Sequence, residues 1–311
     1  MASPLISVVI PAYNHERYVG DAIESVLDQT CSDLELIVVN DGSTDNTGDV
    51  VQGYTDPRIR YFYQDNQDAY NTINRGLSLA TGHFIAILNS DDIFTTDRLE
   101  LLQNHCREED KVCAFSDVIP IDDKNEEFTD SAFGWNVWHQ DNRNFFFSCK
   151  DLYTAFLHGN FMVTTSNLFM TREAANQVGK FCSLRYLHDY DFIFRMISLY
   201  TDKVSYVHDR QLLYYRIHGG NTLGEAAIIG REQDMELIER YMLASVPEKY
   251  HSRISAGSQR LVALERELQI VRHQLQPSEP TGVRPAFDNL SQSLQIWVRK
   301  QLSAKNNEPT Q

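Results

Sequence analysis

The chain has 311 residues, enough for one large α/β domain with an appendage, and 42% of them are hydrophobic, which is ordinary for a globular protein. Its net charge of −15 at pH 7 argues against a nucleic-acid-binding protein, which would carry a basic face. The five cysteines are scattered and form no CxxC pair, so we expect reduced thiols rather than a disulfide framework or a zinc site.

No stretch of the sequence resembles a signal peptide or a membrane span. The apolar run Leu5–Ile10 is too short for a signal peptide and has no basic residues before it. Nowhere does an apolar run approach the roughly 20 residues that a membrane-spanning helix needs. We therefore expect a cytoplasmic protein, with peripheral contact to the inner face of the membrane left open.

Strands and helices alternate through the first third of the chain. Runs rich in Val, Ile and Leu predict buried strands, and apolar residues spaced three and four apart predict amphipathic helices. We expect strands at 5–10, 34–39, 59–63 and 84–88, and helices at 18–29, just after 40–45, and at 69–80. This alternation is typical of a doubly wound, mostly parallel α/β sheet with right-handed crossovers, a Rossmann-like arrangement. The GxGxxG sequence of dinucleotide-binding domains is absent, because the first strand is followed by Pro11-Ala-Tyr-Asn14.

Two adjacent carboxylates, Asp91 and Asp92, follow directly on the hydrophobic run from Phe84 to Leu88. Open α/β sheets bind their ligands at the carboxyl ends of the strands. Carboxylate oxygens at that edge suit Mg²⁺ or Mn²⁺, which bind one or two carboxylates together with phosphate oxygens. Alternatively, the two carboxylates cap the helix that begins near Asp97, or lie solvated in a turn. The segment by itself favours neither interpretation.

The second half of the chain has a less regular pattern. We expect helices at 99–106, 172–178 and 187–200, strands at 112–119, 164–170 and 212–217, and a loop at 218–222. Residues 120–160 instead mix acidic turns with many aromatic side chains. This segment is either a covering flap whose aromatic residues pack in the core, or a wall of a binding site, because aromatic faces pack well on sugar rings and other flat apolar surfaces.

Five short motifs resemble those of the inverting glycosyltransferases of family 2, which have the GT-A fold. Each motif ends a predicted strand or begins a predicted helix, and together they cover roughly residues 5–225. The motifs are Val8-Val-Ile-Pro-Ala-Tyr-Asn14, Val38-Val-Asn-Asp-Gly-Ser-Thr-Asp45, Asn89-Ser-Asp-Asp92, His188-Asp-Tyr-Asp191 and Tyr214-Tyr-Arg-Ile-His-Gly-Gly-Asn221.

The resemblance implies that a nucleotide-diphosphate sugar, with a UDP-sugar favoured, donates its sugar to a hydroxyl of a glycan or lipid-linked acceptor with inversion. It implies a hexosyl- or N-acetylhexosaminyl-type transferase similar to those that build bacterial surface polysaccharides. The expected cofactor is Mn²⁺ or Mg²⁺, which acts as a Lewis acid on the diphosphate.

The resemblance also assigns roles to individual residues. Tyr13 would stack on the nucleobase, and Asp41 would accept the imide N–H of a uracil or thymine. Asp189 would be the general base, although an Asp at a helix start is also a common N-cap. His218 would be a metal ligand, although a histidine in a surface loop would look the same in the sequence. The nucleotide-binding residues it implies are Pro11, Tyr13, Asn14, Asp41, Asn74 and Asp91, and the metal ligands are Asp92 and His218, with Asp91 as an alternative.

The sequence departs from the family pattern at three places. Asn89 stands where the family often has Asp, which leaves Asp91 and Asp92 as the metal pair. His188 stands where Glu is usual, so the departure affects the positioning of Asp189 and the choice of acceptor. Thr72-Ile73-Asn74 replaces a common Ala-Arg-Asn, so an arginine facing the diphosphate is either missing or supplied by Arg75.

We divide the chain into a glycosyltransferase domain over 1–225, with a nucleotide-binding half (1–119) and an acceptor-binding half (120–225), and a helical C-terminal extension over 226–311. Within the extension, one helix is expected at 228–243, a linker at 277–285 and a last amphipathic helix at 287–300. Leucine and valine at heptad spacing within 256–276 indicate either a homodimer or packing against the catalytic domain. The last helix could bind a protein surface or a membrane.

Two other functions fit parts of the pattern. A nucleotidyltransferase would need a basic, glycine-rich loop after the first strand, and 11–20 offers neither. A catalytically silent subunit that binds nucleotide sugars and acts as a scaffold in a glycan assembly complex remains the alternative, because His188 departs from the base motif.

Overall fold

The computed structural model describes residues 4–184, 187–218 and 236–243, together with 248, 251–252, 255–256, 259 and 263. Contacts divide the chain into two compact units, 1–263 and 264–311, and every described residue lies in the first. The predicted domain boundary at 225, the linker and the last helix lie outside the described residues, and so does most of the heptad pattern. These assignments stay predictions. No helix of the described part is long and apolar enough to cross a membrane.

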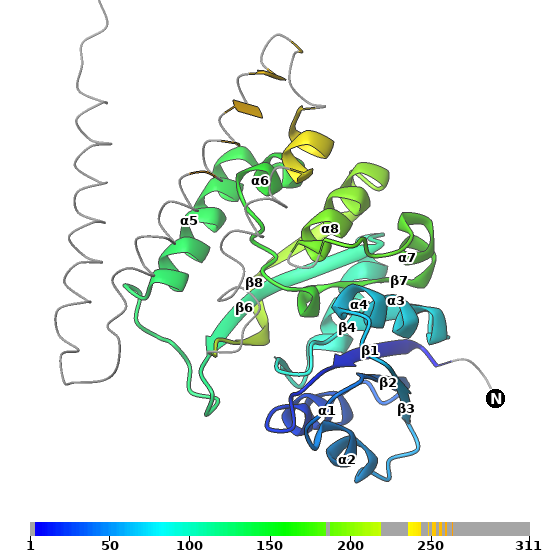
Figure 1. Ribbon diagram of the computed structural model, residues 1–311. Helices are drawn as coiled ribbons and strands as arrows, with labels where there is room; N and C mark the ends of the chain where they lie inside the picture. Colours follow the sequence, from blue (N-terminus) through cyan, green and yellow to red (C-terminus); the bar gives the residue numbers. More distant parts are fainter. Residues whose placement is uncertain are drawn as a thin grey trace, which may run out of the picture. The chain divides into compact units, whose positions relative to one another are not determined.

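The first four long strands form the parallel half of the sheet, as predicted. They adopt the order β3-β2-β1-β4, and the helices that follow them cover both faces. Because side chains alternate along a strand, Val8 and Ile10 of β1 pack in the core beneath α1, whereas Val9 packs in the core beneath α3. The elements are β1 (Ile6–Ala12), α1 (Val19–Leu27), β2 (Leu34–Asp41), α2 (Thr47–Gln52), β3 (Ile59–Gln64), α3 (Ala69–Leu79) and β4 (Phe84–Ile87) (Figure 1).

The sheet continues beyond β4 and includes two short antiparallel strands, one at the end of the strand predicted over 164–170 and one that the sequence pattern did not predict. The eight strands have the order β3-β2-β1-β4-β7-β6-β8-β5. β7 (Phe169–Thr171) runs antiparallel to both β4 and β6 (Cys113–Ile121), and β5 (Ile93–Phe94) runs antiparallel to β8 (Val204–Arg216). β6 and β8 are parallel to each other, so the sheet as a whole is mixed and mostly parallel.

Two strand boundaries in the second half differ from the prediction, for local reasons. The strand predicted over 164–170 starts later, because Thr165–Asn167 form a 3₁₀ turn ahead of β7. β8 begins at Val204 rather than at 212, because residues 208–211 are exposed and polar and hide the strand pattern. β6 and β8 shift register beside them, near Asp117. The remaining helices α4 (Arg98–Glu108), α7 (Arg172–Val178) and α8 (His188–Leu199) match the predicted positions.

The aromatic segment over 120–160 contains two helices that were not predicted, α5 (Gly134–Cys149) and α6 (Leu152–His158). Only His139 and Asn142 of α5 are fully buried, so the apolar spacing that normally identifies a helix is missing. In Figure 1 these two green helices lie on the side of β6 and β8, away from β1–β3. Near the end of the described chain, Ile238–Met242 form a short π-helix, within the range of the helix predicted over 228–243.

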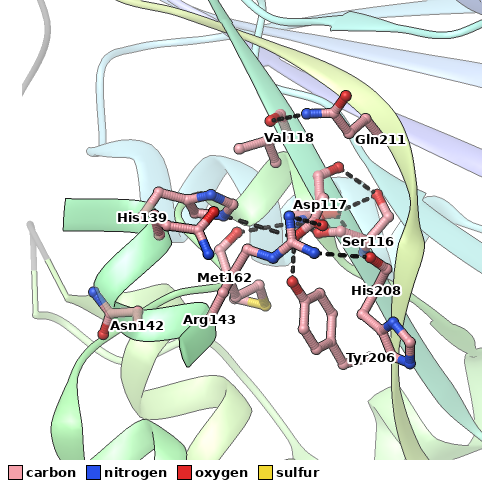
Figure 2. A network of polar contacts seen from close by, with 12 residues as sticks. Ser116, Asp117, Val118, His139, Asn142, Arg143, Met162, Tyr206, His208 and Gln211 are labelled. Atoms are coloured by element: carbon pink, nitrogen blue, oxygen red, sulfur yellow. Dashed lines mark hydrogen bonds and ion pairs between the residues drawn. The ribbon is translucent and has the colours of Figure 1, made fainter. Parts of the chain in front are cut away.

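A buried polar cluster attaches α5 to the sheet (Figure 2). Arg143 contacts the Asp117 carboxylate of β6 at 2.9 Å, and His139 Nε2 lies 3.8 Å from the same carboxylate. Tyr206 of β8 donates a hydrogen bond to Asp117, and Arg143 also donates to the carbonyl of His208 at 3.2 Å. Burial raises the pKa of Asp117 to about 6 and lowers the pKa of His139 to about 4.

His139→Gln is expected to change how stability depends on pH. Wild-type His139 binds its proton less tightly when folded, so the unfolded chain takes up more protons between pH 4 and 6.5 and stability falls as the pH is lowered through that window. The variant loses this effect. The difference in free energy of unfolding, variant minus wild type, should therefore increase by about 2 to 3 kcal/mol when the pH is lowered from 6.5 to 4. Urea unfolding at several pH values measures it. An identical pH dependence in both proteins would contradict the burial of a neutral imidazole.

Candidate active site

The loops after β1 and β2 are joined by hydrogen bonds at one edge of the sheet. Asn14 has a positive φ of 52°, its N–H donates to Ser43 Oγ at 3.0 Å, and its Oδ1 accepts from the Thr44 N–H at 2.8 Å. Tyr13 beside it is 45% exposed, so its ring can stack on a planar ligand. Pro11 pairs with Val39 inside the sheet, which places it directly before this loop.

Asp41 lies buried at the end of β2 with one oxygen in use. Its Oδ1 accepts from Gln64 Nε2 at 2.6 Å and from the Gln67 N–H at 3.0 Å. Its Oδ2 accepts no hydrogen bond from the described residues. A carboxylate held in this way can accept an N–H from a ligand, as the sequence predicted for Asp41. The contact itself stays a prediction.

Asn74 and Arg75 of α3 have partners within the protein. The Asn74 amide pairs with the backbone of Phe181 in both directions, donating at 2.9 Å and accepting at 2.8 Å. Arg75 donates to the Tyr63 carbonyl at 2.8 Å and to Gln64 Oε1 at 3.0 Å. The hydrogen bonds of Asn74 favour a role in positioning the loop at Phe181, and its predicted nucleotide contact stays a prediction.

Three side chains from distant parts of the sequence come together beyond β4. Ligand atoms of His15, Asp91 and His218 all lie within 4.8 Å of one another. His218 Nε2 is 3.1 Å from Asp91 Oδ2, and His15 Nδ1 is 2.8 Å from Ser90 Oγ, which leaves His15 Nε2 for a ligand. Burial would raise the pKa of Asp91, but the hydrogen bond from His218 and the nearby imidazole charges outweigh it and lower the pKa.

Asp91 and His218 were predicted from the sequence, whereas His15 was missed. The available signal was its place in the loop after the first strand, directly behind Asn14, where ligands of an open sheet bind. One carboxylate and two imidazoles form a donor set that can hold a divalent cation. We call these three residues the His15–Asp91–His218 group.

Asp92 faces the protein interior rather than this group. Its Oδ2 accepts from Ser166 Oγ at 2.5 Å, and its Oδ1 accepts from the Arg216 N–H at 3.0 Å. Burial and the neighbouring Asp91 charge raise the pKa of Asp92 to about 8. The N-cap of α4 is Asp97, so neither carboxylate caps that helix. The metal contact predicted for Asp92 stays a prediction, and in this arrangement Asp91 is the better placed of the two.

Arg216, at the end of β8, holds the aspartate loop in place. The residue is fully buried, and its Nε donates to the Asp91 carbonyl at 2.8 Å. Its other nitrogens donate to the Asp122 carbonyl at 2.9 Å and to Asp21 Oδ2 at 3.2 Å. Because β8 continues directly to His218, this arginine fixes the aspartates and the histidine relative to each other.

Asp189 lies buried in the first turn of α8. Leu187 is the N-cap of that helix, so Asp189 does not cap it. Its Oδ2 accepts from Asn160 Nδ2 at 3.1 Å and its Oδ1 from the Tyr190 N–H at 2.7 Å. Burial raises the pKa of Asp189, although the neighbouring His188 and the two hydrogen bonds act in the opposite direction. A carboxylate with a raised pKa is suited to take up a proton.

The segment 164–166 connects Asp92 to the helix that carries Asp189. Ser166 and Thr164 donate to the Asp92 carboxylate, at 2.5 and 3.4 Å. Thr165 comes between them in the sequence, and its hydroxyl oxygen lies 3.5 Å from His188 Nε2. Asn160 and this threonine–serine segment were not singled out in the sequence, because nothing in their spacing distinguishes them from loop residues.

Residues 7–179 match glycosyl transferase family 2, and the chain belongs to that family. An uncharacterized glycosyltransferase of Rickettsia typhi is 31% identical over 227 residues, which are 72% of this chain and 67% of that protein. A chondroitin synthase of Escherichia coli is 27% identical over 251 residues, or 79% of this chain but only 34% of the synthase. The chain thus spans about two thirds of the first relative and a third of the second.

Solved structures share the fold at low sequence identity. TarS of S. aureus, residues 1–349 in complex with UDP-GlcNAc, has a TM-score of 0.55 at 18% identity and covers 84% of this chain and 71% of its own. Glucosyl-3-phosphoglycerate synthase of Mycobacterium tuberculosis, in complex with Mn²⁺, UDP and its product, has a TM-score of 0.53 at 19% identity and covers 79% and 81%. These likenesses establish the GT-A fold, as predicted.

Proposed function

We propose that this family 2 member transfers a hexose or N-acetylhexosamine from a nucleoside-diphosphate sugar to a hydroxyl group, with inversion at the anomeric carbon. The proposal rests on one observation. The His15–Asp91–His218 group lies at the same carboxyl edge of the sheet as the loops that carry Tyr13 and Asp41. A cation-binding group beside a base-binding loop is what a nucleoside diphosphate requires.

A uridine nucleotide is the favoured donor. The unused Asp41 Oδ2 can accept the imide N–H of uracil, and the exposed ring of Tyr13 offers a stacking surface. The structural relatives described above were solved with UDP-GlcNAc and with UDP, which agrees with this choice. Pro11 and Asn14 would shape the loop that receives the base.

The donor set fits Mn²⁺ better than Mg²⁺. Mg²⁺ prefers oxygen ligands alone, whereas the His15–Asp91–His218 group offers two imidazole nitrogens with one carboxylate. A bound Mn²⁺ would neutralise the charge that grows on the departing diphosphate. The mycobacterial relative was solved with Mn²⁺, in agreement with this assignment.

Asp189 is proposed as the general base. Its carboxylate would accept the proton of the acceptor hydroxyl while that oxygen forms a bond to the anomeric carbon. The bond between the anomeric carbon and the diphosphate oxygen breaks in the same displacement, and the nucleoside diphosphate leaves with its electron pair. Attack on the face opposite the leaving group inverts the anomeric configuration. A general base is most efficient when its pKa lies close to the pH at which the enzyme works. The raised pKa of Asp189 agrees with this role.

The acceptor is proposed to be a glycan or a lipid-linked sugar of a bacterial polysaccharide. The similarity to a chondroitin synthase supports a polysaccharide product. A cytoplasmic location, with or without contact to the inner face of the membrane, stays a prediction, as does the homodimer through 256–276.

Thermal unfolding with UDP, dTDP, GDP, CDP and CMP, each with and without Mn²⁺, tests the donor site. A ligand at 100 times its dissociation constant adds about 2.7 kcal/mol to the stability of the folded state, so a melting-temperature shift is expected for UDP only when Mn²⁺ is present. Incubation with UDP-GlcNAc and UDP-glucose should then release UDP. Binding without any UDP release, with or without acceptor sugars, would instead support the silent scaffold subunit.

A further inference from the structure

Asn160 contacts the proposed base and has a second polar atom without a partner. It lies between α6 and the segment 164–166, and its Nδ2 donates to Asp189 Oδ2 at 3.1 Å. Its Oδ1 is buried and accepts no hydrogen bond from any described residue. An unpaired buried carbonyl is costly, so this atom calls for a donor that the described residues do not supply.

The orientation of the Asn160 amide follows from its surroundings. Exchanging Nδ2 and Oδ1 would turn the carbonyl oxygen toward the Asp189 carboxylate, where two acceptors would repel each other. The unpartnered atom is therefore the oxygen, and it needs an O–H or N–H group.

The turn that carries Asn160 is held close to α5. At Gly159, a Cβ atom would lie 2.6 Å from Asn142 Oδ1, so a larger residue would have to displace this amide. The Asn142 amide is itself fixed, because its Nδ2 donates to the Trp138 carbonyl at 2.8 Å. The close approach of Gly159 to the Asn142 side chain thus positions the turn directly before Asn160, separately from the hydrogen bond between Asn160 and Asp189.

We propose that Asn160 binds the acceptor, with its Oδ1 accepting a hydrogen bond from the hydroxyl or amide N–H next to the hydroxyl that Asp189 deprotonates. This inference rests on the proposed function and specifies its acceptor: a sugar unit with two neighbouring donor groups. The Asp189 carboxylate accepts a hydrogen bond from Asn160 Nδ2, so the width of one amide group separates it from Asn160 Oδ1. Two adjacent hydroxyls of a pyranose ring can reach both acceptors, whereas a simple alcohol can reach only one.

Acceptor analogues test this assignment. The wild-type enzyme is first supplied with UDP-sugar, Mn²⁺ and p-nitrophenyl glycosides, and NMR of the product identifies the hydroxyl that is glycosylated. The glycoside deoxygenated at the neighbouring carbon is then compared with its parent. Because it leaves Asn160 Oδ1 unpaired, the deoxy acceptor should have a kcat/KM about ten- to a hundredfold lower than the parent.

The variant Asn160→Ala should lose this discrimination. The kcat/KM of the parent glycoside is expected to fall to the level of the deoxy glycoside, while the dissociation constant of UDP with Mn²⁺ stays within about twofold of wild type. Asn144→Ala, an exposed asparagine of α5, is the matched control and should retain the tenfold or greater preference. If Asn160→Ala does not fold, Asn160→Leu, which preserves side-chain volume, replaces it.

The outcomes separate this inference from the proposed function. Equal kcat/KM for both acceptors in wild type, or an undiminished preference in the Asn160 variant, would overturn the acceptor role. Weaker UDP binding in the variant in proportion to its lost activity would assign Asn160 to the fold instead. If wild type binds no nucleotide and transfers no sugar to any glycoside, the proposed function fails, and the acceptor role of Asn160 fails with it.

Discussion

Asp189→Asn is expected to lower the rate of sugar transfer by about 10²- to 10⁴-fold, the usual contribution of a general base. The amide has the shape of the carboxylate but cannot take up the acceptor proton. The nucleotide would bind at the ends of β1, β2 and β4, whereas Asp189 lies in the first turn of α8, so the dissociation constant of UDP with Mn²⁺ should stay unchanged. Transfer kinetics and nucleotide titration on the same preparation measure both effects.

The pH dependence of transfer provides a second test of the base. Burial raises the pKa of Asp189 above the ordinary value for aspartate, so the acidic limb of the kcat/KM profile should lie above about pH 4. The base is active only when ionised, so the rate falls as the pH is lowered through that pKa. The variant should lack this limb.

A matched control is available on α5. Asp141 is exposed, and Asp141→Asn should leave both the rate and the pH profile as in wild type. Transfer that persists at more than a tenth of the wild-type rate in Asp189→Asn would exclude Asp189 as the base. In that case another group must accept the proton.

Asp91→Asn is expected to abolish the Mn²⁺-dependent part of nucleotide binding. Asp91 supplies the only carboxylate of the His15–Asp91–His218 group, and the variant leaves two imidazoles with an amide. At a UDP concentration 100 times its dissociation constant, wild type should gain about 2.7 kcal/mol of stability with Mn²⁺, and the variant should lose most of that gain. Transfer should fall at least a hundredfold.

Asp92→Asn separates the roles of the two aspartates. The Asp92 carboxylate accepts hydrogen bonds from Ser166 and from the Arg216 N–H, and an amide would turn an N–H toward one of these donors. We expect a loss of about 1 to 3 kcal/mol in the free energy of unfolding, with the response to Mn²⁺ retained. The opposite result, a stable Asp92 variant that no longer responds to Mn²⁺, would restore the metal role that the sequence predicted for Asp92.

The local sequence was sufficient to predict the parallel half of the sheet. Strands β1, β2 and β4 consist mostly of apolar residues without alternation, because a strand buried on both faces needs none. The polar residues that follow such runs must lie at one edge when the strands are parallel. For that reason a ligand site could be predicted at Asp91 and Asp92 from the strand pattern, whereas Tyr13 and Asp41 were assigned to it through the family resemblance.

Other features depended on tertiary contacts. Helices α5 and α6 escaped prediction because their aromatic residues show no single apolar face. The ion pair of Asp117 and Arg143 holds α5 to the sheet, and Ala155 and Phe156 anchor α6 in the core. β7 is only three residues long, and its antiparallel direction follows from its pairing with β4 and β6 rather than from its composition.

The sequence by itself determined which chemical groups this protein brings to the edge of its sheet, since runs, turns and motifs are local properties. Only the tertiary structure decided which of two adjacent aspartates faces the two histidines. It also decided that His15 joins them and that Asn160 lies beside Asp189. Those choices are made by side chains that are distant in the sequence, such as Arg216 and Ser166, whose hydrogen bonds fix the direction of each carboxylate.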